Sequence, residues 1–175
     1  MERTDIVTFK GNRVTLVGTA LKRGDRAPDF RVTDKDLKEV TLKDFKGKVK
    51  LISVVTSLDT SVCDSQLRKF NEEASSLARD VAVLNISMDL PFAIGRFCAT
   101  AGINRVLTCS DHRDASFGKA YGVLIKEFRL LARSVFVIDR DDRIVYMEIV
   151  PEVTGHVKFE KALEEAKALL SRKTA

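Results

Sequence analysis

Apolar runs recur along the chain, and their spacing predicts an α/β order of strands and helices. Five runs carry the strand pattern: Val49–Val55, Val81–Ser87, Arg105–Ser110, Ser134–Asp139 and Arg143–Val150. The first two are rich in Val, Ile and Leu with little alternation, which is typical of central strands covered on both faces. The last two flank Arg140-Asp141-Asp142, a sequence suited to reversing the chain, so they are predicted to pair as an antiparallel hairpin.

Another hairpin is predicted close to the N-terminus. Val7–Lys10 and Arg13–Val17 flank Gly11-Asn12, a pair that favours a tight turn. An isolated two-stranded hairpin is marginally stable in water, so this one, at about residues 5–18, is expected to dock on the body of the protein.

The segments between the strands have helical periodicity. Apolar residues recur at steps of three and four at Leu67, Phe70, Ala74 and Leu77. This spacing predicts a helix over about Ser61–Arg79. The other predicted helices are Pro91–Ala101 ended by Gly102, Ala115–Tyr121 ended by Gly122, and Val157–Leu170. This order predicts a mixed central sheet flanked by helices, in a single domain over residues 1–175.

Composition and charge narrow the class of protein. The 175 residues are 45% hydrophobic and 31% charged, which is usual for a globular protein and argues against disorder. The net charge is +5, but the basic residues are spread out and no nucleic-acid-binding motif is present, so no nucleic-acid partner is expected. The charged N-terminus lacks a secretory signal and no run is long enough to span a membrane, which predicts a cytoplasmic protein without a membrane partner.

Three cysteines, Cys63, Cys98 and Cys109, are the residues whose chemistry needs an explanation. They are too few for a disulfide framework, and no two are spaced C-x-x-C, which excludes a paired zinc knuckle and a thioredoxin-type dithiol. The two histidines, His112 and His156, have no ligand partner nearby in the sequence, so no metal site is expected. In a reducing compartment, a cysteine pair that does oxidise is more typical of catalysis than of structure.

Cys63 follows the predicted strand Val49–Val55 and lies at the start of the first long helix. Reactive sites of open α/β sheets lie beyond the carboxyl ends of the strands, and a helix N-terminus favours a thiolate over a thiol. Thr60, three residues earlier, could place its hydroxyl against the sulfur while it caps the helix. The alternative is that Cys63 is only a small buried apolar residue and Thr60 only a cap.

Two motifs favour the reactive alternative. Ser57-Leu58-Asp59-Thr60-Ser61-Val62-Cys63 resembles the peroxidatic-cysteine motif of thiol peroxidases, the Tpx subfamily of peroxiredoxins. Asp89-Leu90-Pro91-Phe92-Ala93, followed by Arg96-Phe97-Cys98, resembles the resolving-cysteine segment of the same subfamily. Further matches, in the expected order, extend the resemblance over nearly the whole chain: Phe9–Asn12, Gly24–Phe30, Tyr121–Val123, Ala132–Asp139 and Val150–Thr154.

The resemblance implies a thioredoxin-like fold with an N-terminal β-hairpin, in a homodimer that reduces hydroperoxides with electrons from thioredoxin. It makes Cys63 the peroxidatic nucleophile, which becomes a sulfenic acid, and Cys98 the resolving thiol, which closes a Cys63–Cys98 disulfide. It also implies that Thr60 hydrogen-bonds the sulfur and the peroxide, and that the charge of Arg133 favours the thiolate and stabilises the transition state. No cofactor is implied.

The predicted disulfide raises a geometric question. Cys63 and Cys98 lie on different predicted helices, whereas a disulfide needs Cα atoms within about 7 Å. We expect the reduced form to hold the thiols too far apart, so that one or both helical segments unwind locally, helped by Gly95 and Gly102. Cys109 matches no motif cysteine and is expected to be a buried structural thiol.

The chain departs from the subfamily at two places. Thr56 stands where peroxiredoxins carry a proline that shields the cysteine from water, and the segment 124–131 is shorter than usual, which bears on the pocket and on the dimer. Thr56 leaves open a redox sensor or non-catalytic binding module that passes oxidation to a partner. A chaperone-like polyanion binder, which the positive charge alone would favour, has no supporting motif.

Overall fold

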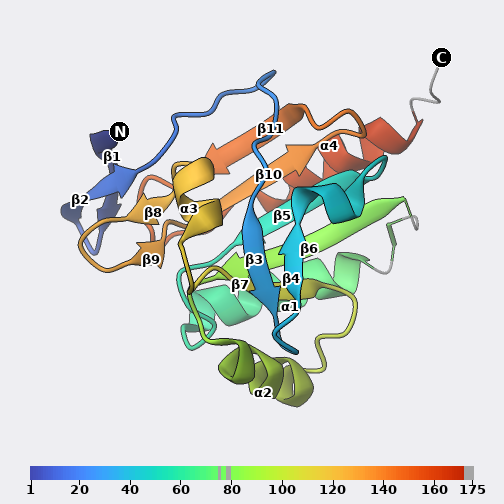
Figure 1. Cartoon of the computed structure of the whole chain (residues 1–175), viewed down its shortest axis with the longest axis horizontal. Coiled ribbons are helices and arrows are strands. Elements are labelled where there is room, and N and C mark those ends of the chain that lie inside the picture. Colours follow the sequence, from blue (N-terminus) through green and yellow to red (C-terminus); the bar gives the residue numbers. More distant parts are fainter. Residues whose placement is uncertain (75, 78–79, 172–175) are drawn as a thin grey trace.

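Seven strands form the central sheet, and their order brings distant loops together (Figure 1). The structure is a computed structural model, and it describes residues 1–74, 76–77 and 80–171. Across the sheet the strands are β11 (Ile144–Ile149), β10 (Ser134–Ile138), β5 (Val49–Val54), β6 (Val81–Ser87), β7 (Leu107–Ser110), β3 (Arg31–Asp34) and β4 (Glu39–Thr41). The three central strands β5, β6 and β7 are parallel, whereas β10 is antiparallel to both β5 and β11. This confirms the predicted mixed sheet and the β10–β11 hairpin.

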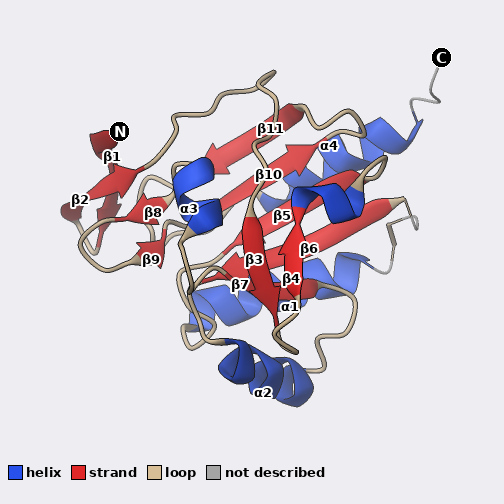
Figure 2. Ribbon diagram, in the orientation of Figure 1, coloured by secondary structure: helices blue, strands red, loops and turns tan. Residues whose placement is uncertain are grey.

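Helices cover both faces of this sheet (Figure 2). On one face, α1 (Ser61–Ala74), α2 (Pro91–Ala101) and α4 (Phe159–Ser171) contribute to one core cluster, which holds Leu67, Phe70, Ile94 and Phe159. On the other face, the short α3 (Ser116–Ala120) packs Phe117 against Phe30, Tyr121 and Phe136. Every residue of β5 is buried, including Lys50 and Ser53, as a segment rich in Val, Ile and Leu predicts for a strand covered on both sides.

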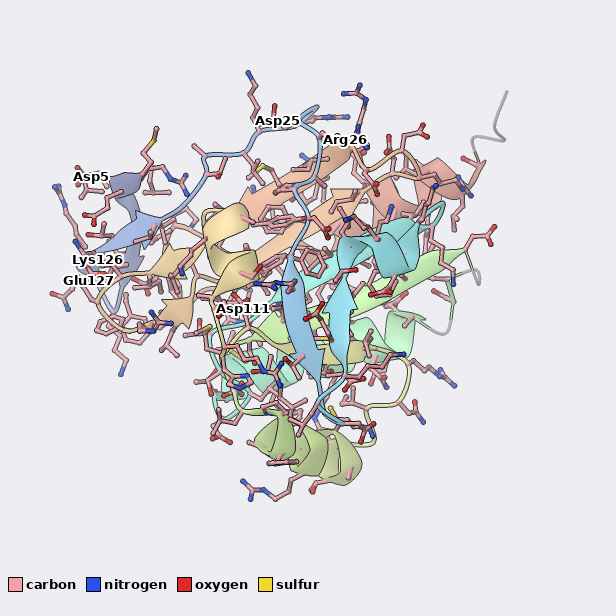
Figure 3. The ribbon with its side chains drawn as sticks, in the orientation of Figure 1. Asp5, Asp25, Arg26, Asp111, Lys126 and Glu127 are labelled. Carbon is pink, nitrogen blue, oxygen red and sulfur yellow. The ribbon has the colours of Figure 1, made fainter. Side chains whose placement is uncertain are left out.

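The N-terminal hairpin pairs β1 (Glu2–Phe9) with β2 (Asn12–Val17), and it belongs to a second sheet. That sheet has the order β1-β2-β8-β9, in which β8 is Leu124–Ile125 and β9 is Leu130–Leu131. The turn residues are Lys10 and Gly11 rather than the predicted Gly11-Asn12, because both have positive φ, as a two-residue hairpin turn requires. Figure 3 shows Asp5, Lys126 and Glu127 gathered around this sheet, at one end of the molecule.

The helix boundaries agree with the predicted signals at most ends. α2 begins at Pro91, has Gly102 with φ 67° after its last residue, and matches the predicted range. α1 begins at Ser61 and is described as far as Ala74, while the predicted end at Arg79 lies outside the described residues. α4 begins at Phe159, two residues later than expected.

Several short elements have no counterpart in the sequence prediction: β3, β4, β8, β9 and the 3₁₀ helix η1 (Leu42–Phe45). Each spans two to four residues, which is too short for a periodic pattern to be recognised. Within the described residues, no helix has the length and apolar character needed to cross a membrane.

Candidate active site

Cys63 lies in the first turn of α1, directly beyond the carboxyl end of β5. The first helical hydrogen bond runs from Asp64 N to Thr60 O, at 3.0 Å, so the thiol is close to the unpaired amides of the helix N-terminus. The Cys63 side chain is fully buried, in the core cluster that also contains Leu58 and Leu67. A thiol in this place is shielded from water and close to a partial positive charge.

Arg133 brings a full positive charge to the same sulfur. It precedes β10, is 1% exposed, and its Nη2 donates a hydrogen bond to Cys63 Sγ at 3.0 Å. Its Nε donates to Val153 O at 3.0 Å and its Nη1 to Gln66 Oε1 at 2.8 Å. The guanidinium is therefore held by two elements of the fold: helix α1, which carries Cys63 and Gln66, and the loop after β11, which supplies the carbonyl of Val153.

The charge of Arg133 is not balanced by a carboxylate. Among the described residues, no acidic side chain forms an ion pair with its guanidinium, whose other partners are a carbonyl and a neutral amide. A buried cation is costly unless an anion accompanies it. Among the described contacts of Arg133, the Cys63 sulfur is the one group that can carry a negative charge, so the guanidinium is placed to stabilise negative charge that develops there.

Gln66 positions the guanidinium and was not singled out from the sequence. Its Nε2 donates to Ser53 Oγ on β5 at 2.8 Å, which turns Oε1 toward Arg133. Gln66 is 93% buried and lies three residues after Cys63, on the same face of α1. A polar residue on the otherwise apolar face that carries Cys63, Leu67 and Phe70 is the signal that could have identified it.

The two threonines that precede Cys63 have different surroundings. The exposed Thr60 donates its hydroxyl to Ser57 O at 3.0 Å, so its hydrogen bond to the sulfur stays a prediction. Thr56, which stands at the proline position, is 5% exposed, and its Oγ1 has no hydrogen-bond partner among the described residues. An unpaired buried hydroxyl is unfavourable for the folded state, which makes Thr56 an unusual residue for this position.

Cys98 lies on α2, in a more open environment than Cys63. It is partly exposed and lines a hollow of about 390 Å³ together with Lys35, Ile94 and Thr108. Burial raises the pKa of the Cys98 thiol, while the neighbouring Thr108 hydroxyl and the Lys35 ammonium act to lower it. Both Cys63 and Cys98 are free thiols in this structure.

Cys109 has the surroundings of a structural residue. It lies in β7, is fully buried in the core cluster on the α3 face, and burial raises the pKa of its thiol to about 12. Nearby Asp111, labelled in Figure 3, accepts hydrogen bonds from the amides of Phe117 and Gly118 in α3. Within the described residues, no cluster of three or more His, Cys, Asp and Glu side chains is placed to hold a metal ion.

A row of polar side chains crosses the sheet beneath the helices that carry Cys63 and Cys98. Ser53, Asn85 and Thr108 are adjacent in register on β5, β6 and β7, so they point to the same face of the sheet. Ser53 is bonded to Gln66, next to Arg133, and Thr108 lines the hollow of Cys98. The amide of Asn85 is buried and has no hydrogen-bond partner in the described structure, and the buried hydroxyl of Thr108 lies beside the Cys98 thiol. The row thus connects the surroundings of the two thiols.

Comparisons with known sequences find a matching family model and similar proteins. The sequence model of the Redoxin family matches residues 22–166. The chain is 61% identical to a thiol peroxidase of Halalkalibacterium halodurans over 164 residues, which cover 94% of this chain and 98% of that protein. It is 62% identical to a thiol peroxidase of Listeria innocua over 161 residues, which cover 92% of this chain and 97% of the relative.

Solved structures share the fold. A peroxiredoxin-like protein from Aquifex aeolicus superposes with a TM-score of 0.88 at 44% identity, covering 95% of this chain and 97% of the other. A thiol peroxidase from Chromobacterium violaceum superposes with a TM-score of 0.80 at 22% identity, covering 93% and 97%, a likeness that concerns the fold alone. The thioredoxin-like α/β fold expected from the sequence is thereby confirmed.

Proposed function

The chain belongs to the Redoxin family, among its thiol peroxidases, and from this premise we propose that Cys63 is the peroxidatic thiol and Cys98 the thiol that resolves it. The protein is a thiol-dependent peroxidase. The observation that carries the assignment of Cys63 is its hydrogen bond from Arg133 Nη2, at 3.0 Å, in a fully buried site. Cys98 and Cys109 have no guanidinium among their described hydrogen-bond partners.

In the proposed first step, the Cys63 thiolate attacks one oxygen of a hydroperoxide. The S–O bond forms as the O–O bond breaks, Cys63 becomes a sulfenic acid, and the leaving oxygen takes a proton to become water or an alcohol. Arg133 acts here by its charge, because its Nη2 lies where it can stabilise the negative charge that develops on the oxygens. The Thr60 hydroxyl would turn from Ser57 O to the bound peroxide.

In the proposed second step, the Cys98 thiol attacks the sulfur of the Cys63 sulfenic acid. The S–S bond forms, the S–O bond breaks, and water leaves. A dithiol reductant, which we propose to be thioredoxin, then restores both thiols by thiol–disulfide exchange. The partly exposed position of Cys98 supports its role as the sulfur that the reductant reaches first.

We also propose that the protein acts in the cytoplasm as a homodimer. Leu90 and Phe92, at the start of α2, are 60% and 73% exposed, and such apolar side chains next to a reactive site support an interface there. The substrate class comprises hydrogen peroxide and organic hydroperoxides.

Replacement of each thiol tests the assignment. Cys63→Ser is expected to abolish peroxide consumption measured by stopped flow with a thioredoxin system as electron donor. Cys98→Ser is expected to form the sulfenic acid at the wild-type rate but to lose turnover with thioredoxin, and Cys109→Ser serves as the matched control with full turnover. Full turnover by the Cys63→Ser protein would refute the proposal.

The second candidate function is a redox sensor that passes oxidation to a partner, and the surroundings of Thr56 favour it. The unpaired hydroxyl at the proline position lies close to the thiol loop, where it bears on the shape of the pocket. A sensor would show slow peroxide turnover and a stable mixed disulfide with its partner, whereas a peroxidase turns over rapidly with thioredoxin. Thr56→Pro would then raise the turnover of a sensor.

A further inference from the structure

The loops that follow β5 and β6 are joined by a single carboxylate. Asp89 lies two residues after β6 and two before Pro91, the first residue of α2. Its Oδ1 accepts a hydrogen bond from Ser57 Oγ at 2.8 Å, and its Oδ2 accepts one from Leu58 N at 2.8 Å. Ser57 and Leu58 belong to the loop that leads into α1 and Cys63, so Asp89 ties the peroxidatic loop to the start of the Cys98 helix.

The same residue is anchored to the sheet on its other side. Ser87 Oγ, at the end of β6, donates to Asp89 Oδ2 at 2.8 Å, and Ser110 Oγ, at the end of β7, donates to the carbonyl of Asp89. Asp89 therefore connects the carboxyl ends of β5, β6 and β7 through hydrogen bonds. In Figure 1, α2 lies at the bottom of the view, below β7 and α1, and because Asp89 is two residues before Pro91, a displacement of the first turn of α2 acts on these contacts.

The described hydrogen bond between α1 and α2 themselves is more exposed, although apolar side chains of both helices share one buried cluster. At the far end of α2, Arg68 Nη1 donates to Ala101 O at 3.1 Å, a bond at the surface. Between the loop and the helix lies a hollow of about 230 Å³, lined by Leu58, Asp59 and Asp89 on one side and by α2 on the other. Hydrogen bonds to a carboxylate are stronger than those between neutral groups, so Asp89 supplies the strongest described hydrogen bonds between the two segments.

The faces of α2 show why this link has to open. Ala93, Phe97 and Thr100 line the hollow next to the peroxidatic loop, whereas Ile94 and Cys98 line the hollow on the β3–β7 side. Side chains one position apart on a helix differ by about 100°. Cys98 thus points away from the loop that carries Cys63, and α2 must turn or unwind before the sulfurs can bond.

We infer that Asp89 is a positioning residue that holds the peroxidatic loop and α2 closed for reaction with peroxide and whose release permits the disulfide. The inference rests on the proposed roles of Cys63 and Cys98. The sulfenic acid has two fates: attack by Cys98, which gives the disulfide and water, or reaction with a second hydroperoxide, which gives the sulfinic acid and water or an alcohol. The closed form favours the second fate and the open form the first, so Asp89 sets the ratio between them.

Asp89→Asn tests this role with little change of shape. Both carboxylate oxygens of Asp89 accept hydrogen bonds, but the amide nitrogen of an asparagine cannot accept one. At least one of these hydrogen bonds is therefore lost in the variant, because two donor groups then point at each other. Reduced protein is mixed with graded hydrogen peroxide without reductant, and intact mass distinguishes the disulfide from the sulfinic acid. The ratio of disulfide to sulfinic acid at a fixed peroxide excess is expected to rise about tenfold, which corresponds to about 1.4 kcal/mol in the opening of the link.

Two further variants make the outcome decisive. Ser57→Ala removes one of the three hydrogen-bond donors to the Asp89 carboxylate and is expected to raise the ratio of disulfide to sulfinic acid by a smaller factor. If Asp89→Asn does not fold, the result for Ser57→Ala alone tests the inference. Asp114→Asn removes an exposed carboxylate elsewhere and is expected to keep the wild-type ratio. Unchanged or lower ratios in both the Asp89 and Ser57 variants would overturn the inference while the proposed function stands. A wild-type protein that consumes peroxide but forms no Cys63–Cys98 disulfide would overturn both.

Discussion

The surroundings of Cys63 and of Cys98 differ in almost every physical respect. Cys63 is fully buried, in contact with a buried guanidinium that two further hydrogen bonds hold in place. Cys98 is partly exposed on a helix that presents Phe92 to solvent, and burial raises the pKa of its thiol. The first environment is rigid and electrostatically prepared for a small oxidant. The second is loosely held and accessible, which suits a thiol that has to move and to meet another protein.

This difference shows how one fold provides different surroundings for two proposed reactions, the oxidation of Cys63 by peroxide and the formation of the disulfide with Cys98. A reaction that depends on a developing charge needs groups fixed before the reaction begins. A reaction between two thiols on different helices needs a segment that can leave its place at low cost. A substitution confined to one of these environments leaves the other as a reference.

Thiol labelling gives the largest contrast. In the folded protein at pH 8, a maleimide is expected to modify Cys98 at least about 10³-fold faster than Cys109, because a pKa near 12 leaves about one thiol in 10⁴ ionised and Cys109 is fully buried. Peptide mapping by mass spectrometry measures both rates. Equal labelling of the two residues before unfolding would show that the region around Cys98 is no more accessible than the core.

Arg133→Lys is expected to lower the rate of Cys63 oxidation about 10²-fold, the usual scale for one donor to a developing charge. A lysine retains the charge but cannot donate to Cys63, Gln66 and Val153 in the same geometry. Stopped-flow oxidation of Cys63 measures the effect, and the labelling rate of Cys98 is the control, expected to be unchanged. A wild-type oxidation rate would contradict the role of the guanidinium.

Gln66→Leu is expected to have a smaller effect, about tenfold on the same rate, because Arg133 keeps its bonds to Val153 and Cys63 but loses the amide that orients Nη1. The same stopped-flow measurement applies. Ser53→Ala, which frees the Gln66 amide to rotate, should reproduce part of the loss. If neither variant differs from the wild type, the orientation of Arg133 does not depend on α1.

Glu152→Gln gives the smallest effect, and it acts on stability. The amide of Gly11, the hydroxyls of Thr154 and Thr8 and further donors hold the pKa of Glu152 well below its usual range. Because the folded-state pKa is depressed, the carboxylate stabilises the fold above about pH 4.5 and this contribution is lost as the pH falls. The melting temperature is expected to be a few degrees higher for wild type at pH 7, with the difference shrinking in acid. A constant difference from pH 3 to pH 7 would contradict the link.

Much of the sheet and its helices could be predicted from the sequence. Long apolar runs indicate buried strands, and apolar residues repeated every three or four positions indicate helices. Val81–Ser87 and Pro91–Ala101 agree with β6 and α2 residue for residue. The short strands β3, β8 and β9 could not be predicted, since their pairing depends on neighbours that are remote in the chain. The predicted position of the hairpin turn was wrong by one residue, because the turn needs a positive φ at Lys10 and such a φ is unusual for lysine.

The candidate site was predictable in part. The motifs identified Cys63, Thr60, Cys98 and Arg133, and the structure brings Cys63 and Arg133 into contact. The partners that hold the guanidinium, Gln66 and the carbonyl of Val153, could not be read from a motif, because their role arises only when α1 and the loop after β11 meet. The carboxylate of Asp89 was part of a quoted motif, yet only its three accepted hydrogen bonds indicate a function.

The polar row of Ser53, Asn85 and Thr108 has a consequence for the thermodynamics of opening. Exposure of apolar surface raises the heat capacity, whereas exposure of polar surface lowers it. When α1 and α2 lift from the sheet, water reaches the unpaired amide of Asn85 and the hydroxyl of Thr108 as well as apolar side chains. Local opening over this row therefore has a smaller heat-capacity change per unit area than unfolding of the whole core, so the enthalpy of opening, per unit area exposed, changes less with temperature than the enthalpy of unfolding.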